Sequence, residues 1–175
     1  MEKIIDTLIW AVILQGLLLG LLYIFSRKYP SQANKLLGFF LLAFVLEALT
    51  NIPLEYIGAY PLNGYFTLPE AKLLLPVLFL HYVLEKVGQT DRYLRMLRIH
   101  YLMAFGVLSF TQIKIILVAV RGKGLHQLFD FHQIETIFMI MQYYAFFLTI
   151  VALAISVHVI LKYRSLVKST YSNLD

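Results

Sequence analysis

The sequence contains no cysteine, and charged residues are scarce. Without cysteine the chain has no disulfide, no thiolate nucleophile and no cysteine-ligated zinc or iron–sulfur site. Charged residues make up 14% of the chain and hydrophobic residues 60%, whereas soluble globular domains carry about 25% charged residues. The mean hydropathy is +0.75. This composition predicts an integral membrane protein.

A separate polar domain is also missing, although the formal net charge is +5. Nucleic-acid-binding proteins concentrate their cations on a polar domain, and here the cations flank apolar segments instead. We therefore expect no direct nucleic-acid binding by these residues, and we interpret the basic excess as a signal of membrane topology.

The apolar residues form long runs. A helix needs about 20 mostly apolar residues to cross the ~30 Å hydrocarbon core, and this length predicts a bundle of five transmembrane helices. The predicted spans are 4–25, 35–52, 69–87, 99–120 and 131–163. The third is the weakest, because its uninterrupted apolar part is short and contains Pro76, which also suits a re-entrant or interfacial segment.

The cations alternate between the connections. Ten fall in the first connection, the third connection and the tail: Arg27, Lys28, Lys35, Lys86, Arg92, Arg95, Arg98, Lys162, Arg164 and Lys168. The other connections and the N-terminus hold Lys3, Arg121 and Lys123. Positive residues accumulate in cytoplasmic loops, so five crossings predict a multi-pass protein of the inner (plasma) membrane with its N-terminus outside and its C-terminus in the cytoplasm.

Glu47 is a carboxylate inside the second predicted span. Such a group costs several kcal/mol unless it is protonated, paired or facing water. Lys72, near the outer end of the third span, is a candidate partner. Two interpretations remain open at this stage: a structural pair within the bundle, or a ligand or proton site.

Three hydrogen-bonding residues, Gln142, Tyr143 and Tyr144, lie at one depth of the last span. They either line a polar pocket or bond to neighbouring helices. Glu135 lies near the outer end of the same span, beside His132. A polar interfacial cap explains that pair better than a metal site, which needs three or four convergent ligands.

The predicted ligand-binding set is therefore Glu47, Glu135, Gln142 and Tyr143. We predict no metal and no cofactor. No serine has a positioned base or a nucleophile-elbow context, and no glycine-rich phosphate loop occurs, so the chain is predicted not to be an enzyme.

Gly16 and Gly20 form a small-xxx-small pair in the first span. Such pairs let another helix approach closely. The partner is either a helix of the same bundle or a second copy of the chain.

The last span is long, and apolar residues continue past it. Residues 131–163 would extend about 50 Å as a helix, so this helix must tilt or protrude. Ile160, Tyr163, Val167, Tyr171 and Leu174 recur at spacings of three and four, which predicts a seam that pairs two helices in a homodimer. Residues 164–175 are predicted to form a cytoplasmic linker whose cations face anionic headgroups.

Four stretches carry a family resemblance: ANKLLGFFLLAF, PVLFLHYVLEK, RIHYLMAF and the final KSTYSNLD. They resemble the N-terminal membrane region of bacterial signalling proteins common in Bacteroidetes. In those proteins the bundle precedes an AraC-type helix-turn-helix domain, a histidine kinase or a LytTR-type output. A linker with tryptophan and the effector follow the Ser-Asn-Leu element there, whereas this sequence ends before both.

The resemblance implies a sensory or signal-input domain that acts on a cytoplasmic effector in cis or in trans. The output residues that it implies are Lys162, Arg164, Lys168, Tyr171, Ser172, Asn173 and Leu174. Two other classes stay open. A small transporter or channel subunit calls for broken helices in both halves of the chain, and Pro76 supplies one break without a detected counterpart. The other is a non-catalytic membrane assembly subunit.

Overall fold

The computed structural model describes residues 2–26, 30–50, 69–121 and 131–171, and within them the regular structure is entirely α-helical. The helices are α1 (Glu2–Phe25), α2 (Gln32–Thr50), α3 (Pro69–Lys86), α4 (Thr90–Arg121) and α6 (Phe131–Tyr171). Three of them, α1, α2 and α6, are long and apolar enough to cross a membrane. The chain is thus a helical protein with the character of a membrane protein.

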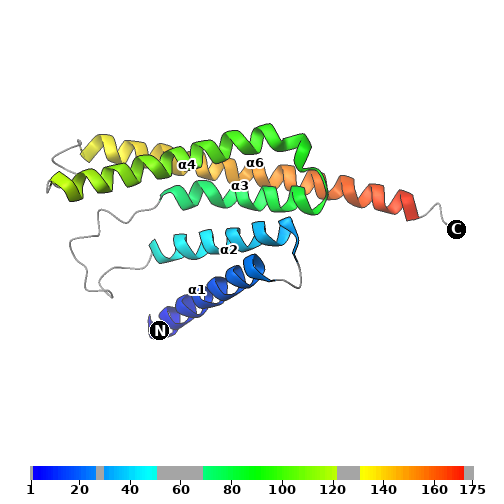
Figure 1. The fold of residues 1–175 in the computed structure, drawn as a ribbon, viewed down its shortest axis with the longest axis horizontal. Coiled ribbons are helices and arrows are strands. Elements are labelled where there is room, and N and C mark those ends of the chain that lie inside the picture. The colour runs from blue at the N-terminus through cyan, green and yellow to red at the C-terminus, as the bar shows by residue number, and fades with distance from the viewer. Residues whose placement is uncertain (1, 27–29, 51–68, 122–130, 172–175) are drawn as a thin grey trace.

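Consecutive helices run in opposite directions (Figure 1). Helix α1 packs on α2, α2 packs on α3, and α3 packs on both α4 and α6. Helix α3 therefore lies at the centre of the arrangement. The start of α1 and the end of α6 lie at opposite ends of the molecule (Figure 1).

Helix α3 is buried despite being the shortest of the described helices. Its residues Val77, Leu80 and Leu84 form one cluster with Leu97 of α4 and with α6. The charged residues near both ends of α3 lower its mean hydropathy. By length and composition α3 is therefore not apolar enough to count as a membrane-crossing helix, whereas α6 is. Its apolar surface is covered by other helices rather than left to face lipid.

Ser31 begins α2. The N–H of Asn34 donates to Ser31 Oγ at 3.1 Å, and the N–H of Lys35 donates to the Ser31 carbonyl at 3.2 Å. A serine in this position satisfies one of the unpaired N–H groups of a first helical turn. Helix α2 therefore begins at Gln32, before the predicted start of the second span at residue 35.

The connection between α3 and α4 is a tight turn, not the loop predicted over 88–98. Gly88 has a φ of 66°, the N–H of Gln89 donates to the Leu84 carbonyl at 2.8 Å, and the N–H of Gly88 donates to Glu85 at 3.3 Å. This pattern is a Schellman C-cap, which requires a left-handed residue at the position of Gly88. Thr90 then donates its hydroxyl to Glu85 Oε2 at 2.6 Å.

Helix α4 consequently begins at Thr90 rather than at the predicted residue 99. Hydropathy missed these turns because Arg92, Arg95 and Arg98 are charged. Arginine, leucine and methionine are nevertheless good helix formers, and Asp91 in the first turn favours the helix electrostatically. These three arginines therefore lie on a helix.

Helix α6 continues through Tyr171, beyond the predicted end of the last span at residue 163. Its 41 residues correspond to about 60 Å of helix. Every residue from 160 to 169 is exposed, and this part projects past the α3–α4 turn (Figure 1). The first residues of the predicted linker are therefore helical, whereas Ser172, Asn173 and Leu174 lie outside the described residues.

The contact between α1 and α2 depends on glycines. Gly16 and Gly20 face α2: a Cβ on Gly16 would lie 2.8 Å from Val45 Cγ2, and one on Gly20 would lie 3.2 Å from the Gly38 carbonyl. Gly38 of α2, which was not predicted to contact α1, faces it most closely: a Cβ there would lie 2.7 Å from the Gly20 carbonyl oxygen and 2.7 Å from Ile24 Cγ1. Here the backbones themselves approach, as small residues allow.

We predict that Gly38→Ala separates α1 from α2 and lowers the free energy of unfolding by about 1–3 kcal/mol, the usual cost of overpacking. The measurement is unfolding in mixed micelles, followed by circular dichroism. Gly106→Ala in α4 is the matched control, because nothing described lies within 4 Å of its Cβ position. It should be neutral or stabilising, and equal destabilisation by the two variants would contradict the glycine contact.

Candidate functional site

An apolar groove lies between α2 and α6, with α3 as its floor. Its volume is about 500 Å³, which falls within the range of about 300–1,000 Å³ typical of small-molecule sites. Helix α2 contributes Phe40 and Phe44, and α3 contributes Leu75, Pro76 and Phe79. We call this feature the α2–α3–α6 groove.

The groove is lined in helical register. Helix α6 presents Gln142, Phe146, Thr149 and Leu153, at spacings of three and four that keep side chains on one face of a helix. The lining residues of α2 and α3 follow the same spacings. The sequence therefore contains the pattern of the groove, but not the information that three helices face one another.

The middle of the groove offers little polarity. Thr149 donates its hydroxyl to the Ala145 carbonyl at 2.8 Å, so its hydrogen-bonding hydrogen is already used within α6. The rings of Phe40 and Phe79 pack with centroids 5.9 Å apart. Pro76 of α3 also lines the groove. It has no N–H, so the floor has no backbone donor at this position.

Polar groups gather at one end of the groove. Lys72 Nζ lies 3.4 Å from Glu47 Oε1, in the ion pair for which the sequence supplied the candidates. The side chain of Glu47 is 14% exposed and that of Lys72 is 40% exposed. Lys72 and Gln142 line the groove, and Glu47 is outside the lining. This end thus presents an ammonium and a carboxamide.

Tyr143 is outside the lining of the groove, and its side chain is 73% exposed. The neighbouring Tyr144 is the partly buried residue, and its hydroxyl donates to Met103 Sδ of α4 at 3.6 Å. Successive helical residues point about 100° apart, so the two tyrosines cannot share one environment. Glu135 belongs to α6, but its side chain lies outside the described part of the structure.

A second polar contact joins α3 to α4 and was not predicted. His81 Nδ1 and the Tyr101 hydroxyl are hydrogen-bonded at 3.1 Å, and Tyr101 stacks against Phe105 with centroids 6.4 Å apart. The sequence showed only an isolated histidine, because its partner comes from another helix. Within the described residues there is no group of three or more potential metal ligands.

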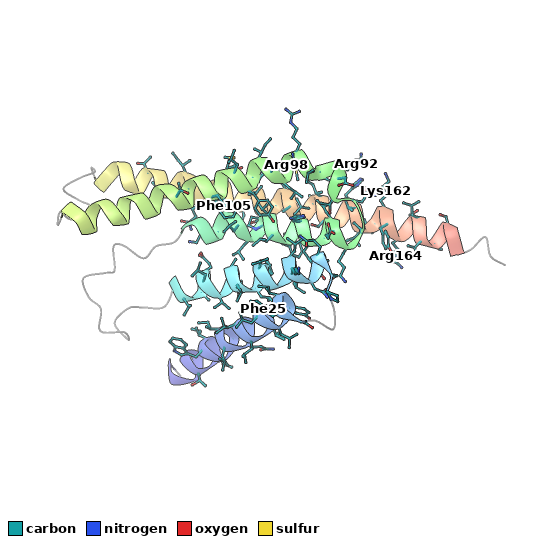
Figure 2. All side chains as sticks on the ribbon, viewed as in Figure 1. Phe25, Arg92, Arg98, Phe105, Lys162 and Arg164 are labelled. Atoms are coloured by element: carbon teal, nitrogen blue, oxygen red, sulfur yellow. The ribbon has the colours of Figure 1, made fainter. Side chains whose placement is uncertain are left out.

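The basic output residues lie away from the groove. Figure 2 shows Lys162 of α6 near Arg92 of α4, at the end where α3 turns into α4, and Arg164 on the part of α6 that projects past this turn. Lys162 and Arg92 border a small cavity of about 20 Å³, together with His158. Lys168 and Tyr171 belong to the last turns of α6.

Comparison with protein-family models, with curated proteins and with solved structures finds no match to this chain. The resemblance to bacterial signalling proteins therefore stays a prediction.

We predict that Lys72→Met destabilises the bundle by about 1–3 kcal/mol, because it leaves the largely buried Glu47 carboxylate without its cation. The double variant Glu47→Gln/Lys72→Met should recover most of that loss. Unfolding in mixed micelles measures both variants, and with Glu47→Gln they complete a double-mutant cycle. Strictly additive effects would show that the pair does not contribute.

Proposed function

We propose that this chain is a five-span signal-input unit of a bacterial inner membrane, with its N-terminus outside and α6 as its output element. In this proposal a ligand or the membrane biases a two-state shift of α6 relative to the other helices. An effector of the DNA-binding or kinase class, in cis or in trans, responds to that shift. The unit itself carries out no chemistry.

The observation that carries the proposal is the continuity of α6. The same helix lines the groove with Gln142 and Leu153, packs into the core with Ala152 and Val159, and continues to Tyr171 beyond the bundle. A continuous helix transmits a rotation or shift along its length because its backbone hydrogen bonds hold successive turns in register. Homodimerisation through the exposed seam at Ile160, Tyr163 and Val167 would supply a second copy for such a movement to act upon.

The proposed crossing of α3 is supported by its position between α2, α4 and α6. Its 18 residues extend about 27 Å, close to the ~30 Å hydrocarbon core. Basic residues near the α3–α4 turn and on the projecting part of α6 share one end (Figure 2), which supports a cytoplasmic assignment of that end.

The topology predicts opposite accessibility of the two ends. Because the chain has no cysteine, Lys3→Cys and Ser169→Cys each introduce a single thiol. In intact inverted and right-side-out vesicles, a membrane-impermeant maleimide should label position 3 from the outside and position 169 from the cytoplasmic side. Labelling of both positions from the same side would reject an odd number of crossings.

Signal transmission predicts that a break in α6 beyond the bundle abolishes output. A DNA-binding reporter that is active only as a dimer is fused after Asp175, and Ser165→Pro is introduced at an exposed position. Proline inside a helix costs about 3 kcal/mol and kinks it, so reporter output should fall at least tenfold. Ser165→Ala is the matched control and should keep its output.

Equal reporter output from the proline and alanine variants, at equal membrane levels, would reject α6 as the output element. Solute uptake by proteoliposomes that requires Glu47 would instead favour the transporter class.

A further inference from the structure

The α2–α3–α6 groove is polar at one end and apolar along the rest. Lys72 and Gln142 mark the polar end, and Phe79 and Leu153 lie toward the other. The Thr149 hydroxyl between them is bonded within α6. A ligand that matches this distribution has one polar head and one apolar chain.

The dimensions suit a single chain. From Gln142 to Leu153 the groove follows α6 for eleven residues, about 16 Å of helix. That is about half of the ~30 Å hydrocarbon core, the depth of one lipid leaflet. Lys72 lies three residues after the start of α3 at Pro69, about 5 Å along the helix, which suits a headgroup at the membrane interface.

The charge of the lining selects the headgroup. Among the described lining residues Lys72 is the only ionisable one, and its side chain is 40% exposed. An ammonium has three donor hydrogens, so Lys72 can hold Glu47 and a ligand oxygen together. The Gln142 carboxamide supplies a further donor. An ionised headgroup gains the most from such donors.

The rims face the surroundings of the bundle. Phe44 is 46% exposed and Phe146 is 68% exposed, on helices α2 and α6 that are both apolar enough to cross a membrane. The groove is therefore open sideways, between α2 and α6.

We infer that the α2–α3–α6 groove binds a free long-chain fatty acid from the bilayer, with its carboxylate on Lys72 and Gln142 and its chain along Pro76, Phe79 and Leu153. Occupancy sets the separation of α2 from α6, and so biases the position of α6. This regulatory part rests on the function proposed above, whereas binding itself does not.

The test uses the purified full chain in phosphatidylcholine nanodiscs and palmitic acid that carries a mid-chain diazirine. Photolabelling should concentrate on groove residues such as Phe79 and Phe146. Unlabelled palmitic acid should compete at about tenfold lower concentration than palmityl alcohol, which has the same chain without the charge. Equal competition by the acid and the alcohol would overturn the assignment of the headgroup.

Two pairs of variants locate the site. Thr149→Trp fills the groove from an exposed position and should reduce labelling about tenfold, while Ile150→Trp, which is outside the lining, should not. Glu47→Gln keeps the cation and should preserve the preference for the acid, whereas Glu47→Gln/Lys72→Gln should abolish it. The comparison of Glu47→Gln with Glu47→Gln/Lys72→Gln tests whether Lys72 holds the carboxylate even if Thr149→Trp fails to fold.

Labelling spread evenly over outward residues such as Ile140 and Phe147 would overturn the site, because ordinary contact with lipid would explain it.

The regulatory part has its own readout. Palmitic acid added to cells that carry the dimer-dependent reporter should change output at least threefold in the unmodified chain and not in Thr149→Trp. If the groove is labelled but palmitic acid does not change reporter output, the binding site stands and its link to output is rejected. A response that survives Thr149→Trp would reject the groove as the input, while Ser165→Pro separately tests α6 as the output element.

Discussion

The enclosure of α3 is the constraint on which the other contacts depend. Helix α3 packs against α2, α4 and α6 at once, and Leu84 at its core is fully buried, beside Leu97 of α4. Lipid tails are as apolar as leucine, so a helix in a membrane gains from close packing more than from leaving lipid. A short helix that is covered by its neighbours can therefore contain Pro76 and charged ends, which a helix exposed to lipid would accommodate less easily.

The same enclosure explains where polar groups are found. His81 and Tyr101 join α3 to α4, and Glu47 and Lys72 join α2 to α3. Each pair satisfies groups that would be costly alone in an apolar environment, and each fixes the relative register of two helices. Helix α6 meets α3 mainly through small and aliphatic residues such as Ala152 and Val159. Among the described side chains, polar pairs therefore join α3 to α2 and to α4, whereas the cluster shared by α3 and α6 is apolar.

Sequence patterns predicted the features that depend on residues close together in the chain, and missed those set by the approach of separate helices. Apolar runs located the five described helices, and the carboxylate of Glu47 within an apolar run pointed to Lys72. Helix α4 begins at Thr90, before the predicted span 99–120, because hydropathy weighs the charge of Arg92 and Arg95 whereas the C-cap at Gly88 decides where the helix begins. Gly38 has no small partner four residues away, so only the contact with Gly20 reveals it. Tyr143 is exposed because it lies on the side of α6 that faces away from α3. The sequence does not show which side of α6 faces α3, because apolar residues occur all around this helix.

Two neighbouring pairs of helices therefore differ in how firmly they are joined. Helix α2 is held to α1 by close backbone approach at Gly20 and Gly38, and to α3 by the Glu47–Lys72 pair. Across the groove, the described side chains of α6 that face α2 are mostly apolar, and open volume separates the two helices. A shift of α6 relative to α2 breaks neither the Gly20–Gly38 backbone contact nor the Glu47–Lys72 ion pair. A shift of α1 relative to α2, by contrast, disrupts the close contact at the Gly38 backbone. Because α6 is one helix from the groove to Tyr171, the helix that borders the groove is also the helix that forms the projecting end.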